Sequence, residues 1–380
     1  MKKIYIKIIS IALAAMLIFP LASCSKGLFD GVESTEEELR VVGSIGGSDV
    51  HYDELYYLIM TCKDMLKSKY GADIFKSEGS AAAYGEELSE MVLERITANY
   101  AIFSLCEAYG MKNVLENGDL VDYVNSSVDE MVYVFAVQNG IEVEIKESIS
   151  GDITYKYERG GYDKAYEIFK EALAYTNVTE RVMRLTLAAE FAFAELTDLL
   201  TGQTGEIIYE ESDIEDFMFS DEFICTRHVF IQNDKGEDVE ANRALAEEAY
   251  AKYQSGTSMD ALMGSKYNED VTLSTKPALY FTRGEYDKAY EDAAFSLRVG
   301  QVSGIVETED GFYIIERCEK SSTYMLSNFE VFAQQITYAL INNKLEEHEA
   351  TLSLEMNDLG SSLDFIKIAV EGDKAEGESK

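Results

Sequence analysis

The spacing of apolar residues along most of the chain predicts amphipathic helices. In residues 88–103 apolar side chains recur every three or four positions, and Gly110 follows as a stop signal. A second helix is expected to begin after Thr179, whose hydroxyl can cap the first turn. Less regular versions of the pattern cover residues 117–138 and 161–176. The apolar stripes are interpreted as the core-facing sides of helices.

The pattern changes near residue 221, where short alternating segments replace the helical period. Strands are expected at residues 223–231, 303–306 and 311–317, with helices at 241–253 and 287–297. This order predicts a small α/β unit of about a hundred residues. A capping box at residues 327–330 (SNFE) then predicts the start of a long helix.

The first 24 residues differ in kind from the rest of the chain. Three lysines precede an apolar run over residues 8–19, and the first acidic residue is Asp30. A charged start and a short apolar run predict a secretory signal, too short for a comfortable membrane span. Residues 21–24 (LASC) resemble the lipobox of bacterial lipoproteins, which implies cleavage before Cys24 and a lipid on its sulfur. The alternative is an uncleaved N-terminal anchor.

The net charge of the chain limits the classes of molecule that it can bind. There are 33 Lys and Arg against 70 Asp and Glu, a net charge of −37, and cleavage would remove three lysines and leave −40. Such an acidic surface argues against nucleic acid and against adsorption to anionic lipid, so membrane attachment is expected through the lipid on Cys24. Hydrophobic residues make up 47% of the chain, which excludes global disorder.

No metal or cofactor is expected. Four cysteines follow Cys24 at wide spacing, without histidines in a metal-ligand pattern: Cys62, Cys106, Cys225 and Cys318. They are interpreted as small buried apolar residues, and a Cys225–Cys318 bridge stays open. His51 and His348 are interpreted as surface residues. Phosphate-loop, HExxH and Gly-x-Ser-x-Gly motifs are absent from the sequence, which removes the common nucleotide and hydrolase classes.

The α/β unit resembles a parvulin-type peptidyl-prolyl isomerase domain. Residues 226–231 (TRHVFI) are similar to the opening strand of that family, and residues 265–270 (SKYNED) to the stretch that follows its first helices. Residues 294–315 are similar to its closing helix and hairpin. Residues 41–55 resemble the N-terminal strand, turn and helix of PrsA/SurA-type foldases. The order of lipobox, helical domain, parvulin unit and returning helix is similar to the PrsA-like plan.

This resemblance implies a site that twists an X–Pro peptide bond, which requires neither metal nor nucleotide. An enzyme of this kind holds the proline ring in an apolar slot and binds the twisted amide better than the planar one. The residues implied as catalytic are His228, Asp270 and Tyr313, and those implied as substrate-binding are Tyr286, Tyr290 and Phe295. The chain departs from the family in three places: Tyr313 replaces a second histidine, residues 275–280 lack the usual glycines, and Tyr286 and Tyr290 stand where the family has Met and Phe.

The expected fold class is α+β: a mainly helical body of N-terminal helices and a C-terminal helix, with an inserted parvulin-like α/β domain. The expected boundaries are residues 1–23 for the signal peptide, 24–40 for an acidic tether, 41–220 for the helical N-terminal domain, 221–320 for the parvulin-like domain, 321–368 for a C-terminal helix packed on the N-terminal domain, and 369–380 for a polar tail.

The function expected from these features is that of a membrane-anchored, extracytoplasmic prolyl isomerase and foldase for exported proteins. Its partners would be unfolded or partly folded exported polypeptides and a bacterial membrane, and a homodimer is possible. One alternative is a non-catalytic holdase whose parvulin domain is degenerate. A weaker alternative is a solute-binding or adhesive lipoprotein, which leaves the similarity of residues 294–315 unexplained.

Overall fold

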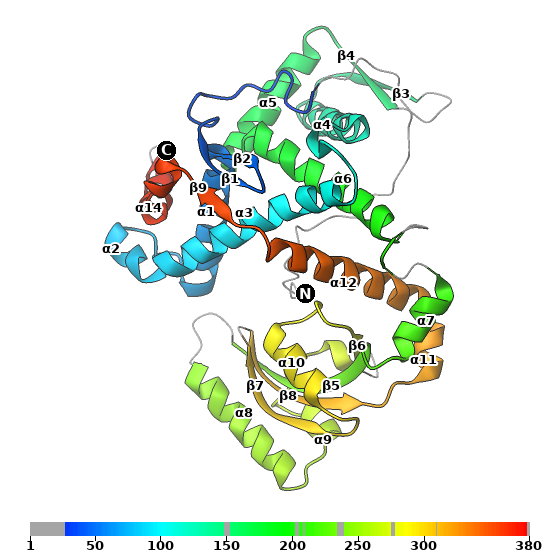
Figure 1. Ribbon diagram of the computed structural model, residues 1–380. Helices are drawn as coiled ribbons and strands as arrows, with labels where there is room; N and C mark the ends of the chain where they lie inside the picture. Colours follow the sequence, from blue (N-terminus) through cyan, green and yellow to red (C-terminus); the bar gives the residue numbers. More distant parts are fainter. Residues whose placement is uncertain are drawn as a thin grey trace. The chain divides into compact units, whose positions relative to one another are not determined.

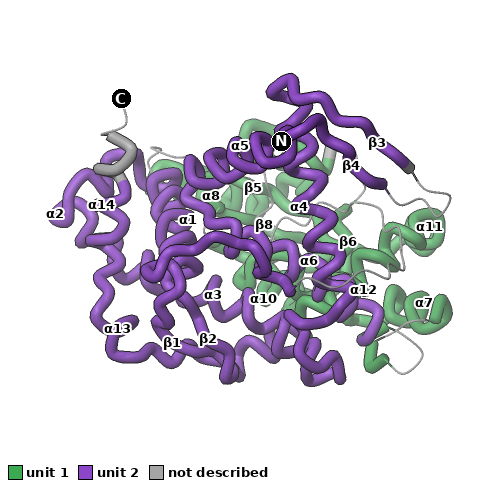
Figure 2. Tube along the Cα trace, turned by 90° about the horizontal axis from the view of Figure 1, so that it is seen from above, with its two compact units in different colours: residues 1–8, 200–344 green, residues 9–199, 345–380 purple. Residues whose placement is uncertain are grey.

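The computed structural model describes residues 27–147, 153–201, 205–207, 210–233, 239–274, 278–308 and 310–377. Cys24 and residues 275–277 lie outside this part of the chain. The chain divides into two compact units, coloured separately in Figure 2. Of the described residues, unit 1 includes those from 200 to 344, and unit 2 includes those from 27 to 199 and from 345 to 377. No helix of the described residues is long and apolar enough to cross a membrane.

Unit 2 is mostly helical (Figure 1). Its first part contains β1 (Val41–Ile45), β2 (Ser48–His51), α1 (Tyr52–Tyr70), α2 (Glu78–Ala81), η1 (Ala82–Tyr84), α3 (Gly85–Ala108), η2 (Val114–Glu116), α4 (Gly118–Gln138), β3 (Val143–Glu147), β4 (Ile153–Tyr157), α5 (Gly161–Tyr175) and α6 (Glu180–Thr201). Its C-terminal part contains β9 (Leu354–Met356), α13 (Asp358–Ser361) and α14 (Phe365–Gly377). The β3–β4 hairpin was not expected from the sequence.

Residues 42–96 and residues 365–370, which are far apart in the sequence, share one core in unit 2. Strand β9 pairs antiparallel with β1, which also pairs with β2. Phe365, Ala369 and Val370 of α14 lie in the same apolar cluster as Leu55 and Val92 of α1 and α3. Burial of these side chains removes apolar surface from water and thereby holds the returning C-terminal segment to the first helices.

Unit 1 contains the four-stranded sheet. Its elements are α7 (Glu211–Phe219), β5 (Ile224–Gln232), α8 (Val239–Gln254), α9 (Met259–Met263), η3 (Thr272–Ser274), β6 (Leu279–Phe281), α10 (Lys288–Ser296), β7 (Val302–Thr308), β8 (Gly311–Cys318), α11 (Ser322–Ser327) and α12 (Phe329–Glu349), whose last residues belong to unit 2. The strand order is β6-β5-β8-β7, and all neighbours are antiparallel. The α+β class, with a sheet-containing domain in a mainly helical chain, is confirmed.

The sheet of unit 1 has two differently covered faces, because alternate residues of a strand point to opposite sides. Val229 and Ile231 of β5 pack with α8 and α9. Ile224 packs in another cluster, with Tyr290 and Ala294 of α10. The side chains of Ile224, Thr226, His228 and Phe230 therefore share the face of the sheet that α10 covers.

Two expectations about the returning helix need correction. Ser327 ends α11, so it does not cap the long helix α12. The first half of α12 packs within unit 1, where Phe332 and Ile336 share a cluster with Phe223. The apolar stripe of α12 was identified from the sequence, but spacing alone does not say which core a stripe faces. Within unit 2 the return to the N-terminal core is made by β9 and α14.

The N-terminal segment and His51 are also more firmly held than expected. Within residues 27–40, which were expected to be a flexible acidic tether, Leu28 is 4% exposed and its carbonyl oxygen accepts a hydrogen bond from Arg184. His51 is not a free surface residue, because its Nδ1 lies 2.8 Å from a guanidinium nitrogen of Arg181. His348 is likewise engaged, with its Nε2 2.9 Å from the hydroxyl of Ser104.

Candidate active site

The candidate site is built on one face of strand β5. Thr226, His228 and Phe230 alternate along the strand, so their side chains emerge on the side covered by α10. Strand β8 lies alongside, with Ile315 opposite His228 and Tyr313 opposite Phe230. Strand β6 pairs with β5 only at Ile224–Thr226, so β8 is the strand that flanks β5 at His228 and Phe230.

His228 is 3% exposed and is held through both ring nitrogens. Its Nε2 lies 2.9 Å from a carboxylate oxygen of Asp270, and its Nδ1 lies 3.0 Å from the hydroxyl of Tyr290. That hydroxyl is also 2.8 Å from the hydroxyl of Thr226. Because the Asp270 carboxylate can only accept, Nε2 carries a proton and donates to it. The contacts at both ring nitrogens fix the orientation of the ring.

Asp270 is ionised at neutral pH. Burial alone would raise the pKa of its carboxyl group, but hydrogen bonds from His228 and Thr272 lower it to about 2. The Thr272 backbone N–H and hydroxyl donate at 2.7 and 2.9 Å. The side chain of Asp270 is 14% exposed, so a negative charge lies at the edge of the site beside the buried imidazole.

Aromatic rings form the rest of the site. The ring of Tyr313 stacks on that of Phe230 at a centroid distance of 4.3 Å and meets His228 edge-on at 5.1 Å. Tyr286 and Phe295 are half-buried and pack on the cluster that includes Phe281. Burial raises the pKa of Tyr313, so its hydroxyl stays protonated at neutral pH and can donate a hydrogen bond. The half-buried rings offer an apolar surface beside hydrogen-bonding groups.

The structure brings together the residues that the sequence singled out. His228 contacts Asp270, Tyr290 and Tyr313 directly, and Tyr286 contacts Tyr290 at a ring distance of 5.4 Å. Phe295 packs on Phe281, which in turn contacts Tyr290. Tyr290 differs from the other aromatic candidates, because it is 2% exposed and serves as a hydrogen-bond partner inside the site.

Three further residues of the site were missed in the sequence. Thr226 and Phe230 lie two positions before and after His228 on the predicted strand. Because alternate residues of a strand share a face, the sequence could have placed both beside His228. Thr272 follows Asp270 by two residues, and its contacts with the carboxylate depend on the turn of the backbone there. Among the described residues, no group of three His, Cys, Asp or Glu is arranged to hold a metal ion.

We expect Tyr290→Phe to destabilise unit 1 by about 1–3 kcal/mol, because Thr226 and His228 would each lose a buried hydrogen-bond partner. The free energy of unfolding, measured in urea, checks this. Tyr175→Phe is the matched control, since Tyr175 is 90% exposed and its hydroxyl meets solvent. An equal change in both variants would contradict the role of the Tyr290 hydroxyl.

A second buried acid lies next to the site. Glu285 precedes Tyr286, and burial raises the pKa of its carboxyl group from 4.5 to about 7. Its oxygens accept hydrogen bonds from the Thr282 backbone N–H and from the Gln335 side chain on α12. These hydrogen bonds lower the pKa only in part, and the charge of Glu291 raises it further.

We expect the stability of unit 1 to fall as the pH rises from 5 to 8. The folded state binds the Glu285 proton more tightly than the unfolded state, so its contribution is complete below a pH of about 4.5 and is lost as the pH passes about 7. Urea unfolding of Glu285→Gln across this range tests the expectation. Between pH 5 and pH 8, the free energy of unfolding should fall less in Glu285→Gln than in the parent. An equal fall in both proteins would contradict the role of Glu285.

Comparison with protein families agrees with the geometry of the site. The family described as "Rotamase: PPIC-type PPIASE domain" matches residues 228–319. The peptidyl-prolyl cis-trans isomerase ssp-1 of Neurospora crassa is 55% identical over 40 residues, 10% of this chain and 22% of that protein. The chain thus spans about a fifth of the length of the first curated relatives that it matches.

A longer similarity is found with foldases. The foldase protein PrsA of Clostridium acetobutylicum is 22% identical over 357 residues, 91% of this chain and 96% of that protein. The crystal structure of PrsA from Bacillus subtilis superposes with a TM-score of 0.24 and 15% identity, covering 83% of this chain and 91% of that chain. The sequence-based resemblance to parvulins and PrsA-type foldases is confirmed by the family match and by the PrsA relatives.

Proposed function

With a PPIC-type isomerase domain at residues 228–319 as the premise, we propose that this protein is a prolyl isomerase and foldase that acts on exported polypeptides. The observation that carries the proposal is the buried imidazole of His228, held by Asp270 on one side and Tyr290 on the other. A ring fixed in this way costs no reorganisation when a substrate binds, which is what preorganised catalysis requires.

The proposed reaction needs no covalent step. Rotation about an X–Pro amide faces a barrier of about 18–20 kcal/mol because resonance is lost as the bond twists. The half-buried rings of Tyr286, Phe295 and Tyr313 would hold the proline side of the bond away from water. The protonated hydroxyl of Tyr313 would then donate to the carbonyl oxygen of the twisted amide. Stabilisation that is stronger for the twisted form than for the planar form lowers the barrier.

The isomerase activity is tested by a protease-coupled assay on a proline tetrapeptide with the purified protein. A rate of cis-to-trans conversion that rises with protein concentration would support the proposal. A rate equal to that of the peptide alone would remove the enzymatic part of the proposal and leave the holdase candidate. The chosen peptide series should vary the residue before proline, because the carboxylate of Asp270 at the edge of the site favours positive charge.

Attachment to the outer side of a bacterial membrane is the second part of the proposal. It is supported by the lipobox ending at Cys24 and by the signal-like segment before it. Two or more acyl chains at one residue hold a protein stably at a membrane. Leu28, four positions after Cys24, is buried in unit 2 and its carbonyl oxygen accepts a hydrogen bond from Arg184, which would keep unit 2 close to the lipid.

We expect Cys24→Ala to carry no covalent fatty acid, because the acyl chains would have no attachment point. Incorporation of a labelled fatty acid by cells that express each variant, followed by immunoprecipitation, measures the loss. Cys318→Ala is the matched control and should be labelled like the parent. Equal labelling of Cys24→Ala and the parent would contradict lipid attachment at this residue.

A holdase activity is the second candidate, supported by exposed apolar side chains in unit 2. Val137 of α4, Ile145 of β3 and Ile153 of β4 are 54%, 51% and 56% exposed, and α4 contacts β3. Apolar side chains gathered on adjoining elements can bind unfolded segments. Suppression of client aggregation that persists in His228→Ala and is lost in Val137→Asp with Ile153→Asp would favour this candidate over isomerisation as the main function.

A further inference from the structure

The described cysteines fall into two chemically different pairs. Cys62 and Cys106 of unit 2 are completely buried. Burial raises the pKa of the Cys62 thiol to about 11 and that of Cys106 to about 12, so neither is a reactive thiolate at neutral pH. Cys225 and Cys318 of unit 1 are close neighbours in the sheet. All four are free thiols.

Cys225 and Cys318 lie directly opposite each other on β5 and β8. Directly opposed residues of antiparallel strands have Cα atoms about 4.5–5.5 Å apart, which is within the range that a disulfide spans. Both side chains point to the same face of the sheet, and the Sγ of Cys225 donates to the carbonyl oxygen of Cys318 at 3.3 Å. The two sulfur atoms can therefore meet without a change of strand register.

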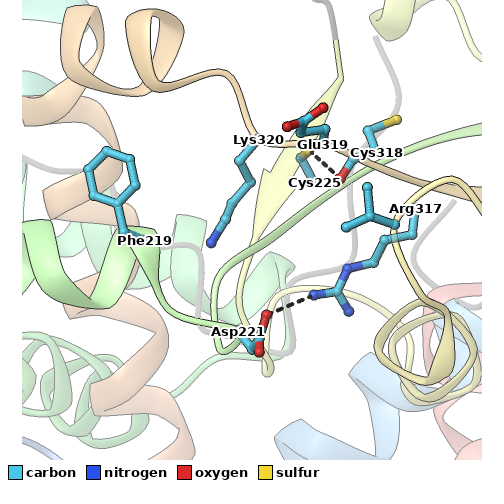
Figure 3. A pocket seen from close by; sticks show the side chains of 8 residues that line it. Phe219, Asp221, Cys225, Arg317, Cys318, Glu319 and Lys320 are labelled. Atoms are coloured by element: carbon cyan, nitrogen blue, oxygen red, sulfur yellow. Dashed lines mark hydrogen bonds and ion pairs between the residues drawn. The ribbon is translucent and has the colours of Figure 1, made fainter.

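One thiol of the pair is accessible. Cys318 is half-buried and lines a pocket of about 240 Å³ that also contains Arg317 and Lys320 (Figure 3). Its interaction with the Cys225 thiol and the positive charge of Arg227 lower the pKa of Cys318. The hydrogen bond with the Cys318 thiol, and then burial, raise the pKa of Cys225. The pair thus combines a half-buried attacking thiol that lines a pocket with a fully buried resolving thiol.

We propose that Cys225 and Cys318 are a redox-active pair whose oxidation joins β5 to β8 by a disulfide. With glutathione disulfide as the oxidant, the Cys318 thiolate attacks one sulfur and releases one glutathione thiolate. The Cys225 thiol then loses its proton and attacks the Sγ of Cys318, which releases the second glutathione. Two protein thiols are oxidised and one external disulfide is reduced to two thiols.

The disulfide would stabilise the parvulin sheet without closing the active site. Cys225 packs with Phe223 and Tyr280, on the face of the sheet opposite to that of His228. The bridge would close the loop that contains the four strands of the sheet from Cys225 to Cys318, and it would thereby restrict the unfolded chain. The proposal is independent of isomerase activity, because it depends only on the two thiols and their strand pairing.

The test treats the purified protein with glutathione disulfide and maps its peptides by mass spectrometry. We expect a Cys225–Cys318 cross-linked peptide that has lost two hydrogen atoms and that reverts with dithiothreitol. The unfolding temperature of unit 1 should rise by roughly 5–10 °C on oxidation. Cys318→Ser, at a half-buried position, should abolish both effects, whereas Cys62→Ser should retain the cross-link.

Three results would overturn the proposal. The first is a stable glutathione adduct on Cys318 with an unmodified Cys225. The second is a cross-link that involves Cys62 or Cys106. The third is a cross-link between Cys225 and Cys318 that leaves the unfolding temperature equal to that of Cys318→Ser treated in the same way.

Discussion

Replacement of His228 by alanine is expected to lower the isomerase rate about 10- to 100-fold. The imidazole makes one hydrogen bond to the ionised Asp270 and one to Tyr290. The imidazole also packs edge-on against Tyr313, the proposed donor to the twisted amide, at a centroid distance of 5.1 Å, so its removal would misplace that donor. Each 1.4 kcal/mol lost from transition-state stabilisation is about tenfold in rate. The value of kcat/KM from the protease-coupled assay measures the loss.

The control for His228→Ala is the same substitution at His348. That residue lies in unit 2, is half-buried, and makes one hydrogen bond to the hydroxyl of Ser104. We expect His348→Ala to keep the parental kcat/KM. Circular dichroism of His228→Ala should match the parent, which separates a lost catalytic group from a lost fold. Equal activity in the two variants would contradict a catalytic role for His228.

Replacement of Arg181 by alanine is expected to destabilise unit 2 by about 3–5 kcal/mol. Its guanidinium nitrogens lie 2.7 Å from Asp53 and 2.8 Å from Glu54, and all three side chains are less than 10% exposed. Removal of the cation leaves two buried carboxylates without the Arg181 charge, although Thr179 still donates to Asp53 and Tyr100 to Glu54. The loss of a buried charge partner costs far more than the loss of a surface pair. Burial raises the pKa of the Asp53 carboxyl group, and the charge of Arg181 lowers it in part. The negative charge of Asp53 is therefore stabilised in the core of unit 2 by Arg181.

A surface ion pair provides the matched control. Arg40 contacts Glu37 at 2.8 Å, but the two side chains are 41% and 68% exposed. We expect Arg40→Ala to cost less than about 1 kcal/mol. Urea unfolding gives the global change, and hydrogen exchange of the α1 and α6 amides assigns it to unit 2. A loss below about 1 kcal/mol in Arg181→Ala would show that the buried network is not needed for stability.

The sequence predicted the elements whose pattern is local. Strand β5 was expected because apolar residues and His228 alternate within one short segment, and α3 because apolar residues recur at helical spacing. The β3–β4 hairpin was missed although Val143 and Ile145 alternate with charged residues, which is itself the pattern of a half-buried strand. Which strands pair with each other is not a local property of the sequence, so the pairing of β9 with β1 could not be predicted.

The site shows the same division between local and tertiary information. His228 and Asp270 were found through short motifs whose residues are contiguous in the chain. The hydrogen bond of Tyr290 to His228 joins residues 62 positions apart, so no local pattern contains it. The network of His51 and Arg181 in unit 2 spans 130 positions, and His51 was accordingly taken for a surface residue.

The central claim is that the site around His228 accelerates rotation about X–Pro bonds. NMR exchange spectroscopy on a proline peptide, without any coupling protease, measures the cis–trans exchange rate in the presence of the purified protein. We expect exchange peaks at substoichiometric protein, reduced about 10- to 100-fold in rate by His228→Ala. An exchange rate equal to that of the peptide alone, with the protein folded, would contradict the claim.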